Sequence, residues 1–362
     1  MRIEDAVLSI FPPPLFLTMP AAGIDISQGS VKCVSLVART NALELGSYSE
    51  VPLPTGVVTD GDIEASDKVA DILRSFRVRL GVRYANASLS ERKSYLYQVL
   101  IPRESKNLRV SVESDLETHV PLPPSEAVFD FEKIRETEAG TIVSVTVYAK
   151  RIVETYAELF EKAGITLRAL EVESQSLARA ALAPSDMTQT VMIIDFGRHT
   201  TRVAIAENGV VAFTATLDIG GDALTAAVVK LFNVPIEEAE KIKNERGFLM
   251  SKENRDLIEA LGTTVSIVKD EVAKHLLYWN SPSATDLPRK PVTKVILCGG
   301  NANLLGFPEY LESAINLPVS LANVWGNAFS LDTYVPPMPL VSSLKYATAI
   351  GLGIRGAHLQ SW

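Results

Sequence analysis

Two aspartates stand at matching places in two stretches of the sequence that share one pattern. Asp25 and Asp195 each end a short apolar run, and each is followed by a small residue two positions on and then by a second apolar run. We interpret both stretches as two strands joined by a tight turn. Four pairs of positions match at one constant separation of 170 residues: Asp25 with Asp195, Ser27 with Gly197, Ser30 with Thr200, and Lys32 with Arg202.

The chemistry that these turns favour is the binding of phosphate and a metal ion. An aspartate at the mouth of each hairpin would bring two carboxylates to one cleft, which suits Mg²⁺ because this ion keeps its waters and takes few protein ligands. Glycine lets backbone N–H groups approach a phosphate closely. Glycine occurs in three of the turns: Ser27-Gln28-Gly29, Gly197 and Gly299-Gly300. The alternatives stay open here, because an aspartate can simply cap a turn and a glycine pair can be a plain turn.

Apolar periodicity outlines the elements that must position these turns. In the first half it predicts a helix over 65–80, a helix capped by Ser105 with an apolar stripe from 108 to 116, strands over 94–100, 127–134 and 141–149, and a helix ending at Gly164. In the second half it predicts helices over 224–232, 235–245, 263–279 and 307–315 and a buried strand over 294–297. Residues 85–165 therefore form a compact α+β insert within the first half.

Composition bounds the class of protein. The 362 residues are 47% hydrophobic and 22% charged, with a net charge of -8, which is ordinary for a globular chain and argues against a non-specific nucleic-acid binder. Cys33 and Cys298 lie in apolar runs, so we expect two buried free thiols and a reducing compartment. The four histidines show no metal-ligand spacing.

The first 20 residues are apolar but carry two acidic residues, and the run Pro12-Pro13-Pro14 interrupts them. A signal peptide has a basic start and an unbroken apolar stretch. No window reaches the roughly 18 apolar residues that cross a bilayer. We therefore expect residues 1–20 to be an N-terminal arm, either disordered or a docking strip, on a soluble protein.

Four segments resemble the actin-like ATPase superfamily and occur in its order. Residues 23–36 look like its first phosphate loop, 193–205 like its second, 294–308 like its adenosine loop and 346–356 like its closing connecting helix. The resemblance implies an α/β, actin-like (ribonuclease H-like) duplicated fold, with two lobes around a nucleotide cleft and an α+β insert in the first lobe. It also implies ATP and Mg²⁺ as cofactors.

The implied division of the chain follows these segments. The first actin-like lobe takes residues 21–84 and 166–188 together with the closing helix 343–356. The insert takes 85–165. The second lobe takes 189–342 and includes a helical subdomain at about 235–285.

Within the superfamily the sequence is most similar to the PilM family of type IV pilus assembly proteins. Residues 108–130 and 145–180, the turn 219–222, and the pair Glu240 and Lys243 carry this likeness. The insert also lies early in the chain, as in PilM and the related division protein FtsA, whereas sugar kinases and chaperone-type members place their extra subdomains elsewhere.

Matching the family motifs position by position gives the expected site. Asp25 and Asp195 correspond to the metal-facing aspartates, and Glu173 to the position that orients the attacking water. The positions expected to bind the nucleotide are Ser27, Gly29, Ser30 and Lys32 in the first loop, Gly197, Arg198 and Thr200 in the second, Gly220, Gly221 and Asp222 in the next turn, Glu240 and Lys243 beside the ribose and adenine, and Gly299, Gly300 and Asn301 in the adenosine loop. An exposed helix pair is the alternative for Glu240 and Lys243.

Three positions depart from the family pattern. Ser27 stands where glycine is usual, and Arg198 and His199 are bulkier than the residues usual in the second loop. The Cβ of Ser27 would crowd the β-phosphate, or its hydroxyl would donate to it, and Arg198 can pair with a phosphate oxygen. We expect ATP binding with weak or absent ATPase activity.

The resemblance implies a cytoplasmic ATP-binding assembly platform, peripheral to the inner membrane. Its partner would be a single-span, PilN-like membrane protein, whose short cytoplasmic N-terminal peptide lies in a groove between the first-half core and the insert. Pilus motor or platform proteins are further candidate partners. Nucleic acid is not expected as a partner, and the membrane is expected only through other proteins.

Other functions of the same fold stay open. An FtsA-like filament-forming division actin is disfavoured by the short, weakly amphipathic tail at 356–362. A small-molecule kinase is disfavoured because no aspartate stands out as the catalytic base. The type II secretion protein GspL is a near relative of this family, so the sequence does not choose between a pilus and a secretion machine.

Overall fold

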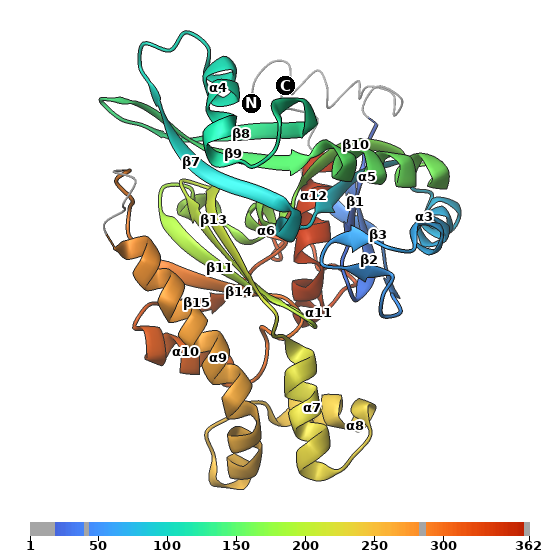
Figure 1. The fold of residues 1–362 in the computed structure, drawn as a ribbon. Helices are drawn as coiled ribbons and strands as arrows, with labels where there is room; N and C mark the ends of the chain where they lie inside the picture. Colours follow the sequence, from blue (N-terminus) through green and yellow to red (C-terminus); the bar gives the residue numbers. More distant parts are fainter. Residues whose placement is uncertain (1–18, 40–42, 282–286, 358–362) are drawn as a thin grey trace.

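In the computed structural model, residues 19–39, 43–281 and 287–357 are described. Their core is built on two five-stranded sheets with the same layout (Figure 1). In each sheet three antiparallel strands follow one another along the chain, and two further strands lie parallel on the other side of the first. This layout confirms the duplicated α/β fold with two lobes.

The first sheet is covered by helices on both faces. Helix α12 lies against one face, whereas α3 and α5 pack their apolar stripes on the other, so every residue of β1 is buried. Gly23 permits the close approach of α12, since a Cβ there would lie 2.0 Å from the carbonyl oxygen of Ala349. The elements are β10 (Thr166–Val172), β6 (Tyr84–Leu89), β1 (Ala22–Ile26), β2 (Ser30–Ala38) and β3 (Leu43–Pro52), in sheet order, with α3 (Ser66–Leu80), α5 (Lys150–Ala163), α6 (Glu173–Ala181) and α12 (Ala347–Ala357).

The second sheet repeats this plan around β11, whose seven residues are all buried. Helix α9 supplies a long buried stripe to its core, and α7 packs against both α8 and α9. In Figure 1, α7 and α8 extend from the sheet, whereas α9 runs alongside it. The elements are β13 (Val210–Leu217), β12 (Thr201–Glu207), β11 (Thr190–Phe196), β14 (Lys294–Cys298) and β15 (Val319–Leu321), in sheet order, with α7 (Gly221–Phe232), α8 (Ile236–Arg246), α9 (Arg255–Asn280), α10 (Phe307–Ile315) and α11 (Leu340–Ser343).

A third sheet, in the order β7-β9-β8, forms the insert with α4. We propose narrower bounds for this unit than the expected 85–165, because β6 pairs with β1 in the first sheet and α5 packs in the first-lobe core. The expected cap at Ser105 is wrong, since the Asn107 side chain caps α4 by accepting from the N–H groups of Arg109 and Val110. The elements are β7 (Ser94–Pro102), α4 (Leu108–His119), β8 (Ala127–Glu136) and β9 (Gly140–Ala149).

The insert also contacts the second lobe through buried and partly buried polar side chains. The hydroxyl of Ser144 on β9 donates to the carbonyl oxygen of Val211 at 2.6 Å. The Gln98 amide on β7 donates to the carbonyl oxygen of Ala212 at 3.1 Å. Arg135 on β8 forms an ion pair with Glu207, whose side chain is fully buried. The insert therefore joins both lobes.

Short elements complete the described chain. They are β4 (Val58–Thr59), β5 (Asp62–Ile63), η1 (Glu91–Lys93), η2 (Pro124–Glu126), η3 (Pro184–Asp186), η4 (Lys252–Asn254) and η5 (Leu344–Tyr346). Cys33 and Cys298 are buried free thiols, as expected. Within the described ranges we find no helix both long and apolar enough to cross a membrane. Residues 1–18 of the expected N-terminal arm lie outside the described residues.

Candidate functional site

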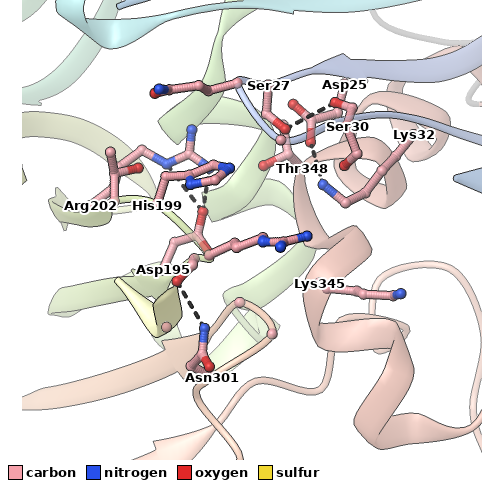
Figure 2. A pocket seen from close by; sticks show the side chains of 18 of the residues that line it. Asp25, Ser27, Ser30, Lys32, Asp195, His199, Arg202, Asn301, Lys345 and Thr348 are labelled. Carbon is pink, nitrogen blue, oxygen red and sulfur yellow. Dashed lines mark hydrogen bonds and ion pairs between the residues drawn. The ribbon is translucent and has the colours of Figure 1, made fainter. Parts of the chain in front are cut away.

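The two hairpins face each other across a cavity of about 480 Å³ between the lobes. Figure 2 shows Asp25, Ser30 and Lys32 of the first hairpin opposite Asp195, His199 and Arg202 of the second. Among the expected site residues, those lining the cavity are Asp25, Ser27, Gly29, Ser30, Lys32, Glu173, Asp195, Gly197, Arg198, Thr200, Gly221, Asp222, Glu240, Lys243, Gly299, Gly300 and Asn301. Gly220 is not in the lining; it is the N-cap residue of α7, next to Gly221.

The first loop is a tight turn whose serine bonds within the turn. The backbone N–H and the hydroxyl of Ser27 both donate to the carbonyl oxygen of Ser30, each at 3.0 Å. The departure from glycine at this position therefore places the hydroxyl hydrogen in the turn rather than toward a ligand. A Cβ at Gly29 would lie 2.9 Å from Nε2 of His199, so the two loops come close at this point.

The second loop is fixed to the beginning of α7. Gly221 donates its N–H to the carbonyl oxygen of Gly197 at 3.0 Å, and a Cβ at Gly220 would lie 2.5 Å from the carbonyl oxygen of Arg198. Asp222 then holds the two bulky loop residues. Its carboxylate lies 3.0 Å from Nε of Arg198 and 2.8 Å from Nδ1 of His199.

The adenosine loop follows β14 and packs on the second hairpin. Gly299 has a φ of 90°, and a Cβ there would lie 2.4 Å from a carboxylate oxygen of Asp195, so only glycine fits. The Asn301 amide donates to the carbonyl oxygen of Gly197 at 2.8 Å. Lys243 Nζ donates to Oδ1 of Asn301 and to Oγ1 of Thr225, each at 3.1 Å. Lys243 is buried, and burial lowers its pKa. Glu240 and Lys243 are therefore not the exposed helix pair that the sequence left open as the alternative.

Each expected metal-facing aspartate has a protein cation beside it. Lys32 Nζ lies 3.5 Å from the carboxylate of Asp25, which also accepts from the Ser88 hydroxyl at 3.3 Å. Arg202 donates through Nε to the Asp195 carboxylate at 3.1 Å. Both cations come from the strand opposite their aspartate, since Asp25 pairs with Lys32 and Asp195 with Arg202 in the strand registers.

The same arginine reaches the acid expected to orient water. Glu173 begins α6, is buried, and lies 2.5 Å from Arg202. Burial raises the pKa of Glu173, and the negative charge of Asp25 adds to this rise, while Arg202 opposes it. The negative charges of Glu173 and Asp195 outweigh the effect of burial and raise the pKa of Arg202 well above its usual value, so its guanidinium stays charged.

Sequence reasoning missed a further acid behind the cavity. Glu91 lies just after β6 and is buried, and burial together with the charge of Glu173 raises its pKa to about 7. One of its carboxylate oxygens has no hydrogen-bond partner. A position directly after a buried strand was the only available signal. Arg202 was matched to Lys32 in the repeat, but its contact with Glu173 could not be read from the sequence.

Other lining residues were also missed. Lys345, next to the connecting helix, lies 2.5 Å from Glu50 of β3, and both line the cavity. Arg92 forms ion pairs with Asp60 of the first lobe and Asp218 at the end of β13. These charges lie at the ends of elements far apart in the sequence, which is why no local motif pointed to them.

The side chains at the cavity differ from those of a preformed magnesium site. Within the described residues there is no group of three or more acidic, histidine or cysteine side chains arranged to hold a metal. Asp25 and Asp195 share a cavity, but each already faces a lysine or an arginine. The protein side chains as they stand therefore do not make a metal centre by themselves.

Curated relatives of the chain include cell division proteins FtsA. The chain is 26% identical over 255 residues to the cell division protein FtsA of Bacillus subtilis (63% of this chain, 52% of that protein). It is 22% identical over 263 residues to FtsA of Neisseria meningitidis (64% of this chain, 62% of that protein). The chain thus spans less than two thirds of the length of these relatives.

Solved structures show the same fold. The chain matches a PilM-PilN type IV pilus biogenesis complex with a TM-score of 0.75 at 20% identity, over 94% of this chain and 99% of that one. It matches the ethanolamine utilization protein EutJ of Carboxydothermus hydrogenoformans with a TM-score of 0.55 at 16% identity (95% and 90%). It matches MreB5 of Spiroplasma citri bound to ADP with a TM-score of 0.53 at 15% identity (91% and 94%).

A family model settles which group of this fold the sequence falls in. The model described as type IV pilus assembly protein PilM matches residues 23–357, which is nearly the whole chain. Together with the duplicated sheets and the actin-like structural neighbours, this match shows that the chain belongs to the PilM family of type IV pilus assembly proteins, within the actin-like ATPase superfamily.

Proposed function

We propose that the chain binds ATP between its lobes and serves as a cytoplasmic assembly platform in a type IV pilus inner-membrane complex. The observation that carries the nucleotide part is the convergence of three glycine-bearing loops, after β1, β11 and β14, on one cavity. Backbone N–H groups in such loops bind phosphate oxygens. A cavity of about 480 Å³ is also in the size range of small-molecule and cofactor sites.

Magnesium would enter this site with the nucleotide. Mg²⁺ is usually held by substrate phosphates and water, with one or two carboxylates. Asp25 and Asp195 line the cavity and are the acids expected to face the hydrated ion. When bound, the ion supplies positive charge that offsets the charge of the phosphates.

Nucleotide binding can be tested by blocking the cavity. Gly300 lines it, and the nearest atom to an added Cβ is Cβ of Lys345 at 3.6 Å, so a large side chain fits the backbone but fills the space. We expect Mg-ATP to raise the melting temperature of the wild type by several degrees and to leave Gly300→Phe unchanged. Gly262→Phe on α9 is the matched control, since a Cβ there meets nothing within 4 Å. A wild type that ATP does not stabilise would contradict the proposal.

We propose that hydrolysis is slow or absent. Glu173 is held by Arg202, and the hydroxyl of Ser27 bonds within its own turn, so neither is free to act on water or phosphate. A steady-state phosphate-release assay should give a turnover far below roughly one per second, which is the lower end of ordinary enzyme rates. A turnover at or above that rate would exclude a platform whose nucleotide acts as a structural ligand.

The partner that we propose is a PilN-like single-span membrane protein, bound through its cytoplasmic N-terminal peptide. Support comes from the similar solved structure, which is a PilM-PilN complex. We place the peptide where the insert meets the first lobe, with pilus motor or platform proteins as further partners. Strand β8 is an edge strand of the insert there, and an edge strand can accept an added peptide strand. Gln175 of α6 donates to Glu132 of β8 at 2.8 Å across this junction.

This placement can be tested with a labelled peptide. The peptide is the cytoplasmic N-terminal segment of a PilN-like single-span membrane protein, and binding is followed by fluorescence anisotropy. We expect Glu132→Lys to weaken binding at least tenfold, because it reverses a charge at the junction. Glu154→Lys, at an exposed position of α5, is the control and should bind as the wild type does. Equal affinity in all three proteins would contradict the placement.

A filament-forming protein is the second candidate, because the curated relatives are FtsA proteins. Sedimentation and electron microscopy with Mg-ATP distinguish the two. A platform stays in the supernatant, whereas ordered filaments would favour the FtsA-like function.

A further inference from the structure

One side chain dominates the charge balance on the second-lobe side of the cavity. Arg202 lies between Asp195 and Glu173, and the side chains of all three are at most 16% exposed. It donates to the Asp195 carboxylate through two of its nitrogens and lies 2.5 Å from Glu173. The buried carboxyl group of Glu91 also interacts electrostatically with Arg202.

These carboxylates require a cation. Carboxylates removed from water are strongly disfavoured unless a positive charge pairs with them. Either a divalent metal or a protein cation can fill that role. Arginine fills it well because its planar guanidinium offers several donors in a fixed fork, so that it can serve two carboxylates at once.

In the first hairpin the cation is held less firmly beside its aspartate than in the second. Lys32 stands at the matching position and forms an ion pair with Asp25 at 3.5 Å as a single point charge, and its charge also acts on Glu50 of the neighbouring strand β3. A lysine has a flexible stem and can move aside for a ligand more easily than an arginine held by two acids. The two hairpins therefore differ in how firmly a protein cation is held beside each aspartate.

We propose that the guanidinium of Arg202 takes the position between Asp195 and Glu173 that a divalent cation would otherwise take. The second hairpin then gives no direct ligand to a metal, and the magnesium of bound ATP is met from the side of Asp25. The proposal deepens the proposed nucleotide site, because it states which of its two aspartates handles the ion. Arg202 acts here as a positioning residue that also holds Glu173 away from water.

The test measures metal binding without nucleotide. Mn²⁺ is the probe, and the free ion is counted by electron paramagnetic resonance. We expect the wild type to bind Mn²⁺ no tighter than millimolar. In Arg202→Met the guanidinium is gone, and we expect one new site at least tenfold tighter, with a melting temperature that Mn²⁺ raises. Arg202→Lys keeps a cation and should bind Mn²⁺ as weakly as the wild type.

A matched control separates this effect from the general loss of a buried ion pair. Arg135 is 15% exposed, as Arg202 is 16%, and its partner Glu207 is fully buried outside the cavity. Arg135→Met should therefore lose stability without gaining a Mn²⁺ site. If Arg202→Met does not fold without metal, recovery of its fold on addition of Mn²⁺ is measured in its place, and Arg135→Met should show no such recovery.

The outcomes distinguish this inference from the proposed function. Tight Mn²⁺ binding by the wild type, or no gain of affinity on removal of the guanidinium, would overturn the inference whatever ATP does. If Mn²⁺ behaves as expected but calorimetry detects no Mg-ATP binding to the wild type, the result supports the role of Arg202 in place of a metal ion. The same result contradicts the proposed nucleotide binding.

Discussion

The two hairpins at the cleft have the same backbone arrangement but different side-chain interactions. β1 and β2 pair as β11 and β12 do, and Asp25 and Asp195 occupy the same register opposite a basic residue. In the first hairpin the basic residue meets one acid, whereas in the second it joins two. The comparison teaches that duplication of a fold sets where side chains lie, while the surrounding charges decide what they can do.

The largest expected effect comes from deleting each hairpin's cation. Arg202→Met leaves Asp195 and Glu173 buried and uncompensated, so we expect a loss of about 3–5 kcal/mol in the free energy of unfolding. Lys32→Met removes the ion pair of Asp25, which still accepts from Ser88, while Glu50 keeps its ion pair with Lys345, and we expect a loss of about 1–2 kcal/mol. Urea unfolding in metal-free buffer measures both. Equal losses would break the distinction between the hairpins.

The next effect concerns the glycine of each turn. A Cβ at Gly197 would lie 2.8 Å from the backbone oxygen of Thr200, which cannot move freely, so Gly197→Ala should cost about 2 kcal/mol. A Cβ at Gly29 would lie 2.9 Å from the tip of the His199 side chain, which can shift by giving up its contact with the half-exposed Asp222. Gly29→Ala should therefore cost less than Gly197→Ala, about 1 kcal/mol. Thermal unfolding of the two variants checks the order, and a reversed order would show that the loops differ from this description.

The smallest effect is a pH dependence from Glu91. Its pKa rises from 4.5 to about 7 on folding, so between these values the folded protein keeps a proton that the unfolded chain has released. The resulting stability is fully present below pH 4.5 and is lost as the pH rises through 7. Glu91→Gln stays neutral, so at pH 8 it should be more stable than the wild type by about 1–2 kcal/mol. Between pH 5 and 8 the free energy of unfolding should change less with pH in the variant than in the wild type. An equal change in both proteins would contradict the raised pKa.

The sequence was sufficient for the parts of the site that local pattern encodes. The two hairpins were predictable because each combines apolar alternation with an aspartate at the end of its first strand. The turn at Gly299 was predictable because it directly follows a buried strand. In each case the residues that define the feature are neighbours in the chain.

The rest depended on contacts between distant elements. Arg202 and Glu173 come from different lobes, and no local signal joins them. The helix expected at 263–279 begins at Arg255 instead, because the buried residues Leu257 and Leu261 continue its apolar stripe past Gly262, which resembles a break. We propose narrower bounds for the insert because β6 pairs with β1 in the first sheet, a contact that the sequence of β6 does not reveal.

The attachment of the insert to β13 has a mechanical consequence. The insert is continuous with the first lobe through β6 and α5 and bonded to the second through Ser144, Gln98 and Arg135. The lobes are thereby joined on the side of the insert, in addition to the ion pair of Arg202 with Glu173 inside the cavity. We expect any parting of the lobes to occur by rotation about that side, so that a nucleotide enters or leaves at the opposite edge, toward the helices α7 and α8.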